Sequence, residues 1–194
     1  MNTKIAVSCI NSGSTKLFPK GTSLNQVIDE FGVEMKSDIL GALVNNELRE
    51  LSFEVFHPVS VQFIDINHPE GMRMYTRGLS FVLYKAVHEH FPQATLRINH
   101  SISKGIYCRL INTDVILTSQ DIADIKQRML DIVSANLPFV QVEEETEEVI
   151  HKFEEQGLTD KINLLKHRGR SYSVYYKLNG HIDSFYGFMI PSTG

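Results

Sequence analysis

The sequence lacks a long apolar stretch. Runs such as Phe81–Tyr84 are far shorter than the roughly 20 residues that a membrane-spanning helix requires. No apolar segment of signal-peptide length follows the N-terminal residues Met1–Lys4. These absences exclude a visible membrane anchor or secretion signal, and we expect a cytoplasmic protein that has no membrane partner.

Cysteine and basic charge are also scarce. Cys9 and Cys108 lie far apart and form no Cys-x-x-Cys or Cys/His pattern, which predicts reduced thiols rather than a disulfide or a zinc site. Lys and Arg number 19 against 23 Asp and Glu, a net charge of −4 that disfavours a general nucleic-acid-binding surface. With 42% hydrophobic and 22% charged residues, the chain has the composition of an ordinary globular protein.

The first part of the chain has the pattern of a small sheet-rich unit. Lys4–Ile10 predicts a strand, and Thr22 or Ser23 is suited to cap a helix that starts at Leu24 and stops at Gly32. Further strands are expected at Ile39–Val44 and Val59–Ile66, with a tight turn at 45–48. Strands, one helix and then more strands within residues 1–66 are typical of a β-grasp domain.

The second part of the chain mixes helices and strands. The turn-forming segment Asn67–Gly71 is the best domain boundary, so a second domain is expected at 71–194. The expected helices are 72–91, a helix capped within Thr118–Asp121, an acidic helix starting at Glu143–Glu148, and a short helix at 161–166. The expected strands are 96–98, 105–110, 139–142 and 172–178.

Several segments together resemble the N-terminal region of threonyl-tRNA synthetase. The matching segments are Phe18–Ser23, Ala42–Leu48, Glu70–Arg73, Thr76–Leu83 and Lys104–Cys108. The resemblance implies an α+β fold, in which a β-grasp (TGS-like) domain precedes an editing-like domain. The second would be an α/β two-layer domain with a mainly antiparallel sheet.

The departures from that family concern its editing motifs. In the synthetase, a His-x-x-x-His motif and a Cys-x-x-x-His motif face one cleft. The matching positions here are Arg77, Phe81, Phe185 and Met189. Since the last three neither titrate nor bind a cation, the sequence predicts that this segment does not deacylate mischarged tRNA, and no catalytic residue is assigned.

A second resemblance is to bacterial uridine kinase-like proteins, carried by Arg77–Leu83, His100–Cys108, Asp183–Gly187 and Pro191–Gly194. It implies a non-catalytic regulatory or ligand-binding region of a uridine or nucleoside kinase. The P-loop domain, a transferase acting on ATP with Mg²⁺, would follow Gly194 and be the main partner. This segment itself would need no cofactor, because Gly13–Lys16 and Lys20–Thr22 lack the P-loop spacing.

The resemblance to the editing fold implies that three segments surround one cleft, and their polar residues are the candidate site for a nucleotide or a small anion: Arg77, His100, Ser101, Lys104, Tyr107, Asp183 and Tyr186. The alternative is that Arg77 and Asp183 form an internal ion pair and that the tyrosines belong to the core. No metal site is expected, because His88 and His90 are two residues apart and point to different sides of a helix. Of this pair, His90 is expected at the edge of the core and His88 in solvent.

Two other functions stay open. The basic run Lys166–Arg170 would contact RNA in an RNA-binding or trans-editing relative of threonyl-tRNA synthetase, although a solvated turn is the favoured interpretation. A hydrolase that uses His100 is the third hypothesis. The scattered histidines and the isolated cysteines add no further nucleophile or metal pattern.

Overall fold

The computed structural model describes residues 4–103 and 105–194, which fold into two compact units. Unit 1 extends to Arg77 and includes Gly187–Pro191, whereas unit 2 comprises Gly78–Tyr186 and Ser192–Gly194. Helices accompany mainly antiparallel sheets in the fold, as the expected α+β class requires. The domain limits expected from the sequence, 1–66 and 71–194, stay a prediction.

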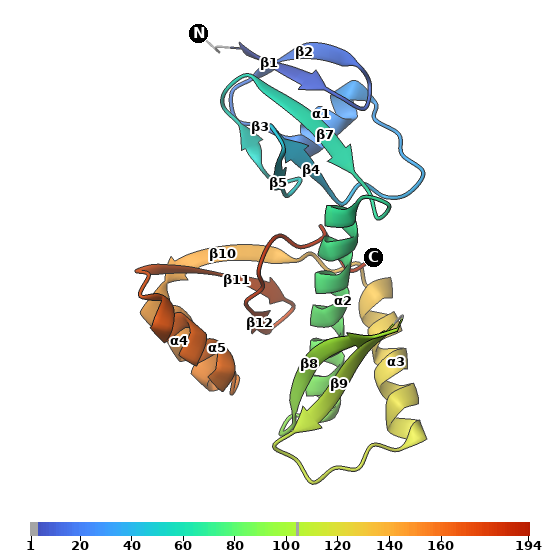
Figure 1. The fold of residues 1–194 in the computed structure, drawn as a ribbon, viewed down its shortest axis with the longest axis vertical. Coiled ribbons are helices and arrows are strands. Elements are labelled where there is room, and N and C mark those ends of the chain that lie inside the picture. The colour runs from blue at the N-terminus through green and yellow to red at the C-terminus, as the bar shows by residue number, and fades with distance from the viewer. Residues whose placement is uncertain (1–3, 104) are drawn as a thin grey trace. The chain divides into compact units, whose positions relative to one another are not determined.

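Unit 1 is built around a five-stranded sheet with the order β2-β1-β7-β4-β5. β1 runs parallel to β7, and the other neighbours in this sheet are antiparallel. Figure 1 shows α1 lying beside this sheet, and β3 pairs with β6 in a separate small ladder. The elements are β1 (Lys4–Cys9), β2 (Ser14–Pro19), β3 (Thr22–Ser23), α1 (Leu24–Phe31), β4 (Gly41–Val44), β5 (Glu47–Arg49), β6 (Glu54–Val55) and β7 (Val59–Ile64).

Local sequence signals explain the elements of unit 1. In β1 the buried residues Ile5, Val7 and Cys9 alternate with more exposed ones, the period of a strand with one face on a core. The Ser23 side chain accepts a hydrogen bond from the Gln26 amide and completes a capping box at the start of α1. Gly32 ends this helix in the left-handed conformation, with φ of 60°. The predicted start and stop of α1 are confirmed.

The turn between β4 and β5 has a two-residue hairpin geometry. Asn45 and Asn46 take φ angles of 49° and 67°, which asparagine tolerates better than most residues. The observed turn is shorter than the predicted turn at 45–48, because β5 already begins at Glu47.

Helix α2 (Pro69–His90) contributes its residues up to Arg77 to unit 1 and the rest to unit 2. The helix begins at Pro69, before the Met72 start expected from the sequence. Proline suits the first helical position, because the N–H that it lacks would have no helical partner there and because its fixed φ is that of a helix. Among the described residues, no helix has both the length and the apolar character needed to cross a membrane.

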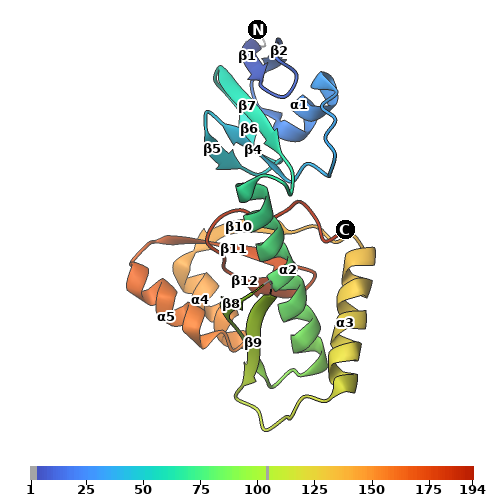
Figure 2. The ribbon, with the colours of Figure 1, turned by 45° about the vertical axis from the view of Figure 1, so that its right-hand side comes forward.

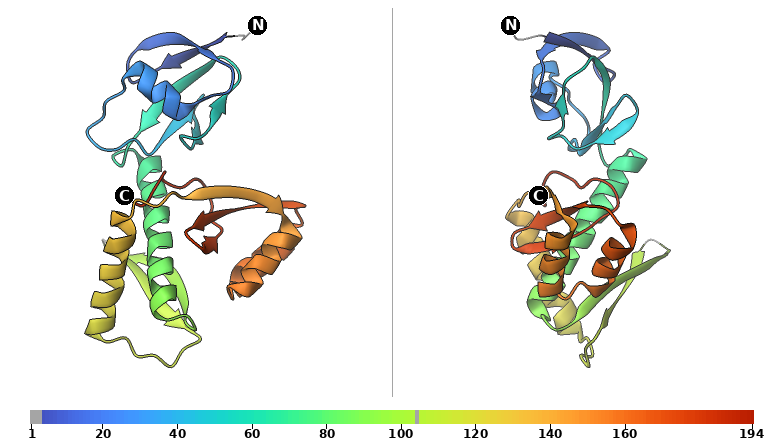
Figure 3. Two further views of the ribbon diagram at one scale, coloured as in Figure 1. Left: turned by 180° about the vertical axis from the view of Figure 1, so that it is seen from behind. Right: turned by 90° about the vertical axis from the view of Figure 1, so that its left-hand side faces the viewer.

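Unit 2 contains a three-stranded antiparallel sheet, β10-β11-β12, and a separate β8–β9 hairpin. Figure 2 shows α4 and α5 side by side near β10 and β11, and Figure 3 shows α3 running alongside the later part of α2. The further elements are β8 (Thr95–Ile102), β9 (Gly105–Ile111), α3 (Ser119–Ser134), β10 (Val140–Glu145), α4 (Thr146–Glu155), α5 (Thr159–Arg168), β11 (Tyr172–Leu178) and β12 (His181–Asp183).

The sequence predicted that the acidic run Glu143–Glu148 starts a helix, but only the second half of the run is helical. Its first three residues belong to β10, where they pair with β11, and α4 begins only at Thr146. The Glu144 carboxylate accepts a hydrogen bond from the Tyr175 hydroxyl and pairs with Lys152. Strand pairing thus satisfies backbone groups that a helical first turn would have left unbonded, and it overrides the helical preference of glutamate.

Candidate functional site

One polar cavity of unit 2 surrounds the ion pair of Lys161 and Asp183. The Lys161 Nζ lies 3.1 Å from the Asp183 Oδ1, and it also donates to the backbone carbonyl of Ser184 at 2.8 Å. The cavity has a volume of about 480 Å³, within the range of small-molecule sites. We call it the Lys161 pocket. It is lined by Ser80, Tyr84, Leu96, Arg97, Ile98, Asp160, Lys161, Asp183 and Phe185.

Four segments bring these side chains together. Tyr84 comes from α2, Arg97 from β8, Lys161 from the first turn of α5, and Asp183 from the end of β12. A cation in the first turn of a helix opposes the helix dipole. The Asp183 carboxylate offsets that unfavourable placement by pairing with Lys161.

Burial shapes the titration of this pocket. It raises the pKa of the Asp183 carboxyl, whereas the Lys161 ammonium and the hydrogen bond from the Ser184 amide act in the opposite direction. Burial, together with the carboxylates of Asp183 and Asp160, also raises the pKa of the Tyr84 hydroxyl, which is therefore a neutral O–H donor at physiological pH.

The Tyr84 hydroxyl is buried without a hydrogen-bond partner among the described residues. Such a group is uncommon, because a buried hydroxyl without a partner loses its hydration and gains nothing in return. A ligand oxygen at the wall of the pocket would satisfy it.

Aromatic side chains fill two of the positions where the resembling family has polar editing residues. Phe81 is fully buried, and its ring centroid lies 5.4 Å from that of Phe185 and 6.0 Å from that of Phe139. The other two positions lie in unit 1, where Met189 is buried and the Arg77 Nε donates to the Phe188 carbonyl at 2.8 Å. Phe81, Phe185 and Met189 offer no titratable group for water activation, as the sequence indicated.

The structure distributes the predicted cleft residues over several places. His100 and Tyr107 meet on the β8–β9 hairpin, with ring centroids 5.7 Å apart, and Ser101 is exposed on β8. Asp183 belongs to the Lys161 pocket. Arg77 is described with unit 1, and Lys104 lies outside the described residues. None of His100, Ser101 and Tyr107 lines the Lys161 pocket, so their joint role in one cleft stays a prediction.

Tyr186 and the basic run meet at the end of α5. The Arg168 guanidinium lies 4.5 Å from the centre of the Tyr186 ring, which is 75% exposed. Lys166, Arg168 and Arg170 are all exposed, and Gly169 ends the helix in the left-handed conformation. Since α5 has 10 residues, it spans about 15 Å, and the basic run and Lys161 occupy its two ends.

Sequence reasoning missed Tyr84, Arg97 and Lys161 as members of a site. One signal was available, since the helix predicted at 161–166 starts at Lys161, and a lysine in the first turn of a helix needs a nearby carboxylate. Nothing local indicated which carboxylate that would be.

A second polar cluster lies at the end of α2. Lys85 is 2% exposed, and its Nζ donates to the Glu89 Oε1 at 2.8 Å and to the Asn179 carbonyl at 3.0 Å. The same Nζ lies 3.0 Å from the His181 Nδ1, and the His181 and His88 rings are in edge contact.

The expected positions of His88 and His90 were wrong. His88 packs beside His181, whereas His90 is exposed and lies 3.3 Å from Asp121. Across residues 4–103 and 105–194, no group of three or more His, Cys, Asp and Glu side chains has the arrangement of a metal site.

No family model matches the chain, but individual proteins do. It is 25% identical over 186 residues to a threonine–tRNA ligase of Syntrophomonas wolfei, covering 95% of this chain and 29% of that enzyme. The ligase of Ehrlichia chaffeensis is 26% identical over 92% of this chain and 28% of its own length. The ligase of Anoxybacillus flavithermus is 27% identical over 94% of this chain and 28% of its own length.

The chain thus spans between a quarter and a third of the length of the curated relatives it matches. These relatives are consistently threonine–tRNA ligases. That finding overturns the hypothesis of a regulatory region of a uridine or nucleoside kinase, and with it the expected transferase and its P-loop partner. The resemblance to threonyl-tRNA synthetase is supported, as a region of the larger enzyme.

Proposed function

We propose that this chain is a tRNA-binding relative of the N-terminal region of threonyl-tRNA synthetase, in which the Lys161 pocket holds an aminoacylated RNA end without hydrolysing it. In this proposal unit 1 is a β-grasp (TGS-like) domain and unit 2 an editing-like domain. The strand order β2-β1-β7-β4-β5, with β1 parallel to β7, supports the first assignment. Similarity to threonine–tRNA ligases over 90–95% of the chain supports both.

The observation that carries the proposal is the polar composition of the Lys161 pocket. An aminoacyl ester of a nucleotide presents a positive α-ammonium group, a negative phosphate and several oxygen atoms. The pocket offers the carboxylates of Asp160 and Asp183, the cations of Arg97 and Lys161, and the unpartnered hydroxyl of Tyr84. Each charge on such a ligand therefore has a complementary group.

Binding without hydrolysis follows from the aromatic substitutions. Phe185 lines the pocket and Phe81 is fully buried against it, so neither position supplies an imidazole or thiol that would activate water. The described residues that line the pocket include no histidine or cysteine.

RNA binding is tested by titrating the full chain with tRNA at several salt concentrations. We expect a complex that weakens with salt, because phosphate contacts release counterions. Changing Lys166, Arg168 and Arg170 together to alanine should reduce the slope of log K against log salt by about 2–3. Lys4, Lys20 and Lys36, all exposed in unit 1, provide a matched control triple with the same loss of charge. Equal losses in the two triples, or no complex at low salt, would overturn the proposal.

A trans-editing hydrolase is the second candidate, and it rests on Asp183. This carboxyl is buried and its raised pKa is a property often found in general acids and bases. Turnover of aminoacyl-tRNA that is lost in Asp183→Asn while tRNA binding persists would favour this candidate. The main proposal predicts no turnover above the uncatalysed rate.

A further inference from the structure

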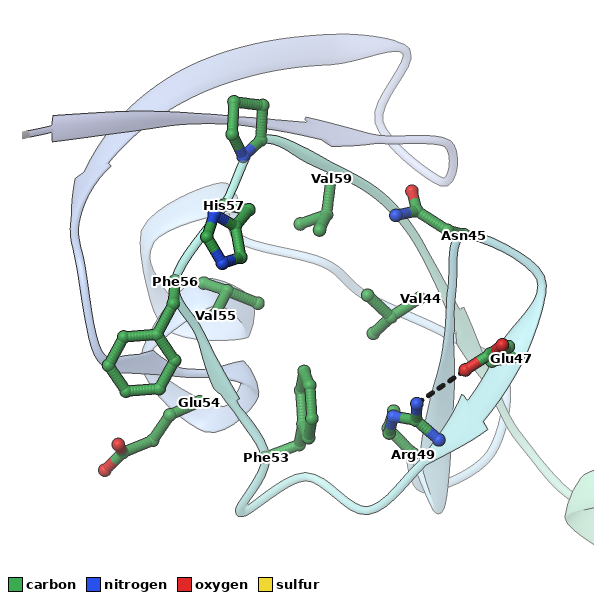
Figure 4. A pocket seen from close by; sticks show the side chains of 11 residues that line it. Val44, Asn45, Glu47, Arg49, Phe53, Glu54, Val55, Phe56, His57 and Val59 are labelled. Atoms are coloured by element: carbon green, nitrogen blue, oxygen red, sulfur yellow. Dashed lines mark hydrogen bonds and ion pairs between the residues drawn. The ribbon is translucent and has the colours of Figure 1, made fainter.

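Unit 1 has a pocket of its own, between the ends of β4 and β7. Figure 4 shows it as a ring of side chains from β4, β5, β6 and the segment that leads into β7. Its volume is about 480 Å³. We call it the Phe53 pocket, because the Phe53 side chain points into its centre.

Two phenylalanine rings of this pocket are unusually accessible. Phe53 is 37% and Phe56 50% exposed, whereas Val55 between them is 1% exposed and belongs to the core of unit 1. Burying a phenylalanine ring is favourable by about 1.5–3 kcal/mol. Two accessible rings in one concave site are therefore a feature that a ligand would cover, rather than the scattered apolar exposure of an ordinary surface.

The Phe53 ring is already held in place on one side. The Arg49 guanidinium carbon lies 5.1 Å from the ring centre, and this guanidinium donates to the Glu47 carboxylate at 2.6 Å. A second donor of Arg49 bonds to the Leu48 carbonyl at 3.1 Å. In Figure 4, Arg49 lies to one side of the ring, and the other side looks toward Phe56. The pocket thus presents one face of an ordered aromatic ring.

We propose that the Phe53 pocket binds a nucleobase, stacked on the face of Phe53 opposite Arg49. Bases offer a flat π-surface for stacking, and their edges carry hydrogen-bond donors and acceptors. Around the ring, Arg49 supplies N–H donors, Glu47 a carboxylate acceptor, and Asn45 and His57 groups of both kinds. Arg49, Glu47 and the Asn45 Oδ1 already have partners within the chain, so the edge of the base would meet their remaining donors and acceptors.

The charge at the rim indicates that the base, and not a phosphate, is recognised. The lining carries two carboxylates, Glu47 beside Arg49 and Glu54 on the side of Phe56, against the single guanidinium of Arg49. Binding should therefore depend weakly on salt, unlike contacts to phosphates. Purines should bind more tightly than pyrimidines, because their larger rings overlap more of Phe53. Since every residue used here belongs to unit 1, the inference goes beyond the Lys161 pocket and does not depend on it.

The absence of tryptophan from the sequence allows a direct test. Phe53→Trp in the full chain introduces a single indole, whose fluorescence is quenched when a base stacks on it. We expect saturable quenching by AMP and GMP, weaker binding of CMP and UMP, and little change with salt. Tyr75→Trp is the matched control, because Tyr75 is an exposed aromatic residue of unit 1 outside the pocket, and it should show no saturable quenching.

A second measurement leaves Phe53 in place. Fluorescent 2-aminopurine nucleotide is titrated with the unaltered chain and with Phe53→Leu, whose affinity should be about tenfold lower because stacking is lost. Circular dichroism verifies that the variant is folded, and amide chemical shifts of the unaltered chain locate the bound nucleotide independently of any variant.

The two sources of a base are separated by the ligand. Saturation by mononucleotides supports a nucleotide site, and saturation only by a short single-stranded RNA supports an unpaired base of RNA. If neither ligand saturates the Phe53→Trp signal and no amide shift near Phe53 occurs, the inference is overturned. Because mononucleotide binding is measured without tRNA, its outcome is separate from that of the tRNA titration.

Discussion

The ammonium group of Lys161, in the first turn of α5, lies 3.1 Å from the carboxylate of Asp183 at the end of β12. The same ammonium lies 5.4 Å from the centre of the Phe185 ring and bonds to the Ser184 carbonyl. One side chain thus links a helix, the last strand of the sheet and the aromatic wall of the pocket. It supports the structure of unit 2 and supplies charge to the site.

The first prediction concerns the energy of this pair. Removal of one partner from a buried pair leaves an uncompensated charge, so Lys161→Met should lower the free energy of unfolding by about 2–3 kcal/mol. Asp183→Asn should cost about 1–2 kcal/mol, because the Lys161 side chain is 26% exposed and remains partly hydrated. Urea denaturation at neutral pH measures both. The double variant should lose less than the sum of the single losses.

Lys166→Met is the control for this series, since Lys166 is an exposed residue of the same helix and its loss should change stability by less than about 0.5 kcal/mol. Strictly additive losses of Lys161 and Asp183 would show that the two groups do not interact.

Local signals made some elements predictable. The serine before Leu24, the glycine after α1 and the capping box of Thr118 and Asp121 at the start of α3 act over four residues or fewer, so the sequence alone reveals them. The start of α4 was missed because the pairing of Glu143 with Val174 depends on a strand far along the chain.

The Lys161 pocket was missed for the same reason. Tyr84, Arg97, Lys161 and Asp183 are far apart in sequence, and only the packing of α2, β8, α5 and β12 makes them neighbours. Asp183 was predicted as a site residue from a resemblance, but its partner was not. Long-range pairing of charges leaves no periodic or local trace in a sequence.

The second prediction concerns the acid range. Burial raises the pKa of the Glu89 carboxyl, but hydrogen bonds from Arg128 and Lys85 outweigh that effect and lower the pKa to about 2. A carboxyl whose pKa is lower in the folded state stabilises the protein above its unfolded pKa, and this stabilisation is lost as the pH falls from about 4.5 toward 2.

Glu89→Gln should therefore cost about 1–2 kcal/mol at neutral pH, a value discounted for the partial exposure of the carboxyl, and almost nothing near pH 2. Denaturant titrations across this pH range provide the measurement. The exposed Glu154 gives the control variant Glu154→Gln. A difference between Glu89→Gln and the unaltered chain that stays constant with pH would contradict the assignment.

The third prediction concerns a glycine at the start of α2. A Cβ atom at Gly71 would lie 2.0 Å from the Asp65 carbonyl oxygen, which accepts a hydrogen bond from the His68 amide. Helix propensity alone predicts that Gly→Ala stabilises a helix by about 1 kcal/mol. The backbone clash should reverse that sign, and Gly71→Ala should lose about 2–4 kcal/mol in thermal or urea unfolding.

Gly105→Ala serves as the comparison, because its Cβ would meet the Ile102 carbonyl at 3.8 Å, an ordinary contact. Its effect should stay below about 1 kcal/mol. If Gly71→Ala were as stable as the unaltered chain, the close approach of α2 to the Asp65 carbonyl would be refuted.

The central claim is that the Lys161 pocket holds an aminoacylated RNA end without cleaving it. The most direct measurement compares the affinity of the full chain for threonyl-tRNA and for the same tRNA without its amino acid, while the ester bond is followed over time. We expect the aminoacylated form to bind about tenfold more tightly, because its α-ammonium group meets the pocket carboxylates. Asp160→Asn should reduce that difference, and the ester should decay at the uncatalysed rate. Equal affinity for the two tRNA forms, or accelerated loss of the amino acid, would contradict the claim.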